Sequence, residues 1–145
     1  MNPRRVLVVA NLTASSPELA ERVARLAAEA PTRFLLVVPA SADGGKGRTL
    51  TWEEHEVWHA AEGRMQRAVE LLQARGADVD GRVGDGDPVT AVRDVLLSEA
   101  VDLIVVSTFP EDRSRWLVLN LPDRLARATG LPIVHVVAQA EPVAG

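Results

Sequence analysis

The chain has 145 residues and a formal net charge of −4, and an acidic protein of this kind lacks the electrostatic footprint of a nucleic-acid binder. It contains no cysteine, which excludes disulfides, thiol catalysis and cysteine-bound zinc. No apolar run reaches transmembrane length, and the start of the chain is too soon polar for a signal peptide. We therefore predict one cytoplasmic domain over residues 1–145, with its core at about 5–138.

The first third of the chain predicts two strands separated by a helix. Residues 5–10 (RVLVVA) are typical of a buried strand, and Ser16-Pro17 places a capping residue before a first-turn proline. Pro31 ends this helix, and a second strand follows at 33–38. The apolar stripe of the helix comprises Leu19, Val23, Leu26 and Ala30.

The middle of the chain predicts a long helix, a weak strand and a third helix. Thr51 and Glu54 fit a capping box that opens a helix to about Gly76. The strand at 78–83 is interrupted by Gly81, which favours a place at a sheet edge, and Asp87-Pro88 caps the third helix. The side chains expected to face the core are Trp58, Ala61, Met65, Val69 and Leu72 on the long helix, and Val92, Val95 and Leu96 on the third.

The last third predicts two more strands, at 103–107 and 133–137, with a helix between them from Pro122 to about Thr129. Gly130 ends this helix. The preceding segment at 116–121 (WLVLNL) suits a lid, a subunit contact or a strand-like segment on the helix layer. Strands without polar alternation indicate a sheet covered on both faces. The order of the elements predicts an α/β fold with a doubly wound, five-stranded parallel sheet.

Four landmarks of the chain together resemble the universal stress protein family over residues 5–137. They are VVANLTASS after the first strand, Gly86-Asp87-Pro88 before the third helix, DLIVVS at 102–107, and Pro132-Ile133-Val134 opening the last strand. The resemblance implies strand order 3-2-1-4-5 in an adenine nucleotide alpha hydrolase-like fold. It also implies a stress-response module that forms a homodimer through the last strand, at Ile133, His135 and Val137.

The same resemblance draws attention to the loop after the fourth strand. Nucleotide-binding members carry Gly-x-x-Gly, nine residues and Gly-Ser or Gly-Thr there, and backbone amides at the glycines close on the phosphates. This chain keeps the spacing but has Ser107, Pro110 and Asn120-Leu121 at those positions. Pro110 has no amide hydrogen to donate, whereas Asn120 tolerates a positive φ. Asn11 stands where ATP-binding members usually have Asp, and these departures argue against conventional ATP binding.

Strand order 3-2-1-4-5 brings the ends of strands one and four together, at the switch point where ligands bind. We therefore expect a crevice for a small ligand there, although turn segments that satisfy their own backbone would explain the same residues. The candidate ligand-binding residues are Asn11, Thr13, Ser107, Thr108, Arg113, Arg115 and Asn120.

Two other hypotheses concern this crevice. Arginine side chains, including Arg124, could replace the glycine loop and bind ATP or AMP, unless they are surface charges paired with nearby acidic residues such as Asp123. Alternatively, the protein is a dimer without a ligand, with Phe109 and Trp116 filling the crevice.

Residues 55–59 (HEVWH) match the H-E-x-x-H pattern of zinc proteases. His55 and His59 are one helical turn apart, and Glu56 could act as a general base in a zinc hydrolase. The remaining histidine, His135, lies in a strand without a zinc signature. We therefore favour a non-enzymatic role, with a zinc hydrolase as the distant alternative.

Overall fold

The computed structural model describes residues 2–40, 51–110 and 114–139, except for the side chains of residues 51–54, 115 and 118. It contains a five-stranded parallel sheet in the order β3-β2-β1-β4-β5, which confirms the predicted fold. The strands are β1 (Arg4–Val9), β2 (Thr32–Pro39), β3 (Asp78–Gly84), β4 (Leu103–Thr108) and β5 (Ile133–Val137).

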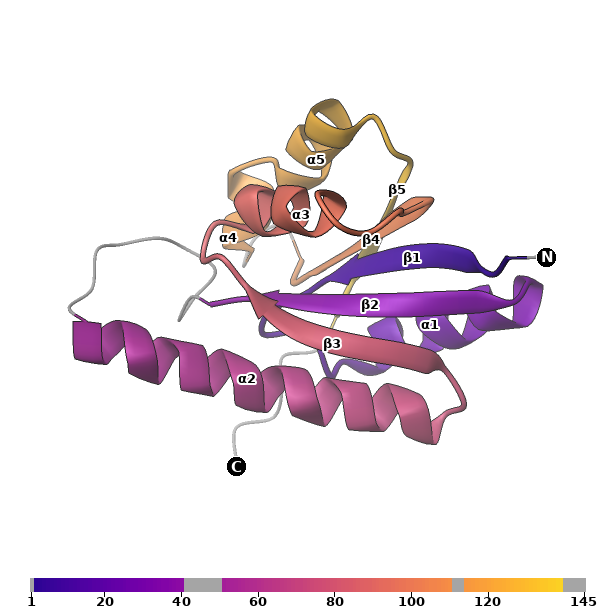
Figure 1. Ribbon diagram of the computed structural model, residues 1–145, viewed down its shortest axis with the longest axis horizontal. Coiled ribbons are helices and arrows are strands. Elements are labelled where there is room, and N and C mark those ends of the chain that lie inside the picture. Colours follow the sequence, from indigo (N-terminus) through magenta and orange to yellow (C-terminus); the bar gives the residue numbers. More distant parts are fainter. Residues whose placement is uncertain (1, 41–50, 111–113, 140–145) are drawn as a thin grey trace.

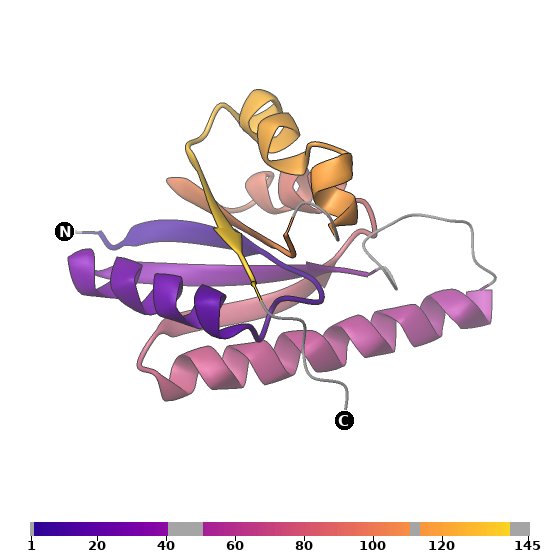
Figure 2. The same ribbon diagram turned by 180° about the vertical axis from the view of Figure 1, so that it is seen from behind.

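Helices cover both faces of the sheet. They are α1 (Pro17–Glu29), α2 (Thr51–Ala74), α3 (Pro88–Leu96), α4 (Arg115–Val118) and α5 (Leu121–Thr129). The first two pack on one face and the last three on the other (Figure 1 and, from behind, Figure 2). In β1, Val6 and Val8 belong to the core under α1 and α2, whereas Leu7 and Val9 belong to the core under α3 and α5. Burial on both faces is the reason that these strands lack polar alternation.

Local signals begin and end the helices where the sequence predicts. Ser16 Oγ accepts a hydrogen bond from the Leu19 amide at 3.1 Å, and the Asp87 carboxylate accepts one from the Thr90 amide at 3.2 Å, so both residues act as N-caps. Gly130 ends α5 with φ 71°, a conformation that glycine adopts without strain. The proposed capping box at Thr51 lies outside the described side chains.

Gly81 lies in β3, which is an edge strand as predicted. A Cβ atom at this residue would stand 2.6 Å from Met65 Sδ and from Val69 Cγ2, both on α2. The glycine therefore lets the helix approach the edge strand closely. This packing gives Gly81 a role beyond interrupting the strand.

The prediction that Trp58 faces the core is wrong. Its side chain is 45% exposed, whereas Ala61 and Leu72 on the same helix are 0% and 1% exposed. The first turns of α2 run beyond the carboxyl ends of the strands (Figure 1). The apolar stripe therefore continues past the surface that it covers.

The segment at 116–121 is not strand-like, because it begins within the short helix α4. Trp116 is 5% exposed and belongs to the core that contains Leu121 and Leu125. Its indole thus helps to fix the chain between β4 and α5. Leu119, by contrast, is 49% exposed. Among the residues that the structure describes, no helix has the length and apolar character needed to cross a membrane.

Candidate functional site

The carboxyl ends of β1 and β4 lie side by side in the sheet. The two strands pair in parallel, with Val6 opposite Leu103 and Val9 opposite Val106. From β1 the chain extends to β2 and β3 on one side, and β4 and β5 lie on the other. This is the topological switch point of the sheet, where doubly wound proteins bind ligands.

Two hydroxyl groups meet at this point. Thr13 Oγ1 and Ser107 Oγ are 2.6 Å apart, and either can be the donor. The residues are 4% and 1% exposed. The same segment also forms backbone turns, since the Ala14 amide donates to the Asn11 carbonyl and the Ser16 amide to the Thr13 carbonyl. Backbone turns therefore satisfy some of the polar groups in the loop after β1, whereas the hydroxyl pair links this loop to the end of β4.

Asn11 is also buried, and its side chain contacts a cation that sequence reasoning missed. Arg64 Nε on α2 donates a hydrogen bond to Asn11 Oδ1 at 3.1 Å. Burial lowers the pKa of Arg64, and the neighbouring charge of Arg67 lowers it further, but a guanidinium remains protonated at neutral pH. Helical spacing could have indicated that Arg64 is on the inward face of α2, because it lies three residues after Ala61 and four before Ala68, both buried.

Thr108 faces β5 rather than the end of β1. Its Oγ1 lies 2.7 Å from the Phe109 carbonyl oxygen and 2.8 Å from His135 Nε2. When the hydroxyl hydrogen goes to the carbonyl, the imidazole must donate through Nε2–H. Partial burial lowers the pKa of His135 below its usual 6.5, which favours the neutral ring in this arrangement.

The remaining predicted residues lie on the approach to α5. Asn120 adopts φ 60° and ψ 43°, the left-handed conformation that the sequence led us to expect. Its side-chain amide donates to Asp123 at 3.4 Å. Arg113 lies outside the described residues, and Arg115 is placed only by its backbone in α4. Arg124 is exposed.

The three residues of the H-E-x-x-H pattern are all exposed on α2. The rings of His55 and His59 meet edge to face, with centroids 4.7 Å apart, and His59 Nδ1 is 3.7 Å from Glu62 Oε1. Within residues 2–40, 55–110 and 114–139, no group of three potential metal-binding side chains comes together. The described residues thus provide no third ligand for a zinc hydrolase.

Three solved structures with this fold contain a bound nucleotide. One is a universal stress protein in complex with cAMP, with 18% identity, a TM-score of 0.65, and coverage of 96% of this chain and 100% of that one. Another, from Archaeoglobus fulgidus in complex with dAMP, has 16% identity, a TM-score of 0.61, and coverage of 93% and 98%. A third, from Arabidopsis thaliana with AMP bound, has 12% identity, a TM-score of 0.58, and coverage of 97% of each chain.

At such identities the likeness establishes the fold alone. No protein with a curated function matches the chain by sequence. The sequence model of the universal stress protein family, however, matches residues 2–137, which include every strand of the sheet from β1 to the end of β5. The chain therefore belongs to the universal stress protein family.

Proposed function

We propose that this protein is a non-catalytic stress-response module that binds a nucleoside monophosphate in the crevice between β1 and β4. The observation that carries the proposal is the buried polar cluster at the strand ends, where Thr13 and Ser107 share a hydrogen bond and Asn11 contacts Arg64. Buried polar groups beside a charged group are the usual means of orienting a small ligand.

The cluster suits one phosphate better than three. Pro110 has no amide hydrogen for a phosphate loop, and the Ser107 hydroxyl is engaged with Thr13. Arg64 supplies a cation by the side of Asn11, and arginine binds a phosphate group through paired donors. Three solved structures with this fold contain cAMP, dAMP or AMP. In this proposal Arg64 has the phosphate-binding role that the sequence suggested for Arg113 and Arg115.

The contacts of the hydroxyl groups support a non-enzymatic role. A nucleophilic serine or threonine needs an adjacent base. In the described part of the chain, His135 bonds to Thr108, whereas Ser107 bonds to Thr13. Neither partner of the buried hydroxyl pair thus contacts the imidazole that would activate it.

We further propose that the chain acts as a single cytoplasmic domain and forms a homodimer along β5. This strand is at the edge of the sheet and pairs only with β4 among the described strands. An edge strand exposes backbone groups that another strand can pair with. We expect sedimentation velocity to show a dimer, which Val137→Lys weakens; a monomeric wild-type chain would contradict this part of the proposal.

Calorimetric titration with AMP and ATP tests the ligand. We expect AMP to bind at least as tightly as ATP, and Arg64→Gln to weaken AMP binding by about tenfold or more, because a hydrogen bond to a charged group is worth that much. Arg67→Gln is the matched control, since this exposed arginine lies one turn away on the same helix. Much tighter binding of ATP, or no binding of either nucleotide, would overturn the proposal.

A further inference from the structure

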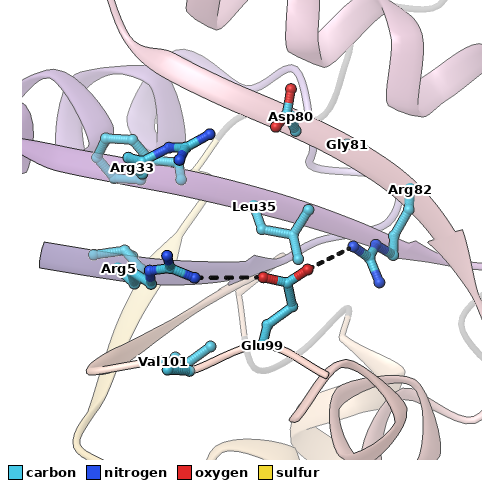
Figure 3. Close-up of a pocket in the computed structure, with 11 residues that line it drawn as sticks. Arg5, Arg33, Leu35, Asp80, Gly81, Arg82, Glu99 and Val101 are labelled. Atoms are coloured by element: carbon cyan, nitrogen blue, oxygen red, sulfur yellow. Dashed lines mark hydrogen bonds and ion pairs between the residues drawn. The ribbon is translucent and has the colours of Figure 1, made fainter. Parts of the chain in front are cut away.

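A cavity lies toward the amino ends of β1 and β2, away from the carboxyl ends of β1 and β4. It has a volume of about 280 Å³ and is lined by the first half of β1 and β2, the middle of β3 and residues 99–101. It opens on the face that carries α3 (Figure 3). Because α3 ends at Leu96, the chain beyond it leaves this part of the sheet partly uncovered.

Three arginines from three adjacent strands line the cavity, namely Arg5, Arg33 and Arg82. Arg5 and Arg33 are directly opposite each other in the β1–β2 register. Arg82 is opposite Val37 in the β2–β3 register. Val37 is four residues after Arg33 on β2, and side chains an even number of residues apart on a strand point to the same face. All three side chains therefore share one face of the sheet. Like charges on adjacent strands repel each other, so compensating anions stabilise this arrangement.

The acidic side chains nearby compensate the arginines only loosely. Glu99 lies between two of them, with Oε1 3.5 Å from Arg5 Nη1 and Oε2 3.3 Å from Arg82 Nη2 (Figure 3). Arg33 Nε is 3.6 Å from Asp78 Oδ2. Charge-assisted hydrogen bonds of arginine with carboxylates are usually about 2.7–2.9 Å. The Glu99 carboxylate is thus shared, at long distances, between two guanidinium groups, each of which has five N–H donors.

We propose that this three-arginine cavity binds a small hydroxylated oxyanion, a hydroxycarboxylate or a sugar phosphate. The oxyanion contacts Arg5, Arg33 and Arg82 and displaces Glu99 from its position between Arg5 and Arg82. Asp80 also lines the cavity, and its carboxylate accepts a hydrogen bond from the ligand hydroxyl. The volume limits the ligand to a small molecule.

The test is a titration of the full-length chain at constant ionic strength, in which NMR monitors the arginine Nε–H signals. The probes are malate and succinate, and glycerol 3-phosphate and inorganic phosphate. Within each pair, a hydroxylated oxyanion is compared with one that lacks the alcohol group. Comparison between the two pairs shows whether the cavity prefers a carboxylate or a phosphate. We expect saturable shifts at Arg5, Arg33 and Arg82, with the hydroxylated probe of one pair binding most tightly.

Two substitutions have opposite expected effects. Arg33→Gln should weaken binding by about tenfold, because it removes hydrogen bonds to a charged group. Glu99→Gln should strengthen binding, because it removes the internal competitor. Arg25→Gln is the control, since Arg25 is exposed on α1 at the other face of the sheet. Arg64→Gln should also leave binding unchanged, which separates this site from the nucleotide crevice.

The proposal is overturned if none of the probes gives saturable shifts. It is also overturned if Glu99→Gln weakens binding as much as Arg33→Gln does. Either result would mean that the arginines and Glu99 form an ion network that only stabilises the fold.

Discussion

The hydroxyl pair of Thr13 and Ser107 should respond to mutation as one unit. Thr13→Val keeps the side-chain volume and leaves the Ser107 hydroxyl buried without its partner, at 1% exposure. Ser107→Ala does the reverse. Leaving a buried polar group unsatisfied costs about 1–3 kcal/mol, whereas removing both partners is nearly neutral. We therefore expect each single variant to lose about 1–2 kcal/mol, and the double variant to lose clearly less than the sum.

Urea unfolding followed by circular dichroism measures this coupling, and the double-mutant cycle isolates the pairwise energy. For a chain of this length, a loss of 1 kcal/mol should lower Tm by about 3 °C. The m-value should stay constant across the four proteins, since none of the changes alters the surface exposed on unfolding. Strictly additive losses would refute the coupling. Single variants as stable as wild type would mean that water already satisfies both hydroxyls.

Trp116→Ala should lower the unfolding free energy by about 3–5 kcal/mol, because it empties a core position, whereas Trp58→Ala should change it by only about 0.5 kcal/mol; thermal denaturation distinguishes them. Acidification below about pH 6.5 should lower stability through His135, because partial burial lowers its pKa and the unfolded chain then binds more protons. Denaturation midpoints at pH 7 and pH 5 should therefore differ less in His135→Gln than in wild type. Gly81→Ala should cost about 1–2 kcal/mol through overpacking, and a smaller loss in a Met65→Ala background would identify the contact responsible.

The sequence alone determined the strands, their covering helices and the main caps. Uninterrupted Val and Ile runs identify strands buried on both faces, and Ser16 and Asp87 act locally on amides three residues away. Most boundaries differ from the predicted ones by only one or two residues. The left-handed conformation of Asn120 could also be predicted from the sequence, since tolerance of a positive φ is a property of the residue itself. The strand order came from the resemblance to the family, because periodicity does not specify which strands are neighbours.

Tertiary structure decided what depends on contacts between distant segments. The Thr13–Ser107 bond joins residues 94 positions apart, and the Arg64–Asn11 bond joins residues 53 apart. Helical periodicity shows which face of α2 is apolar, but not where the sheet beneath it ends, so it placed Trp58 in the core wrongly. The arginine cavity depends on the register of three strands and on the short length of α3. Strand register and helix overlap are set by packing of the whole molecule, and neither is encoded in the local pattern of one segment.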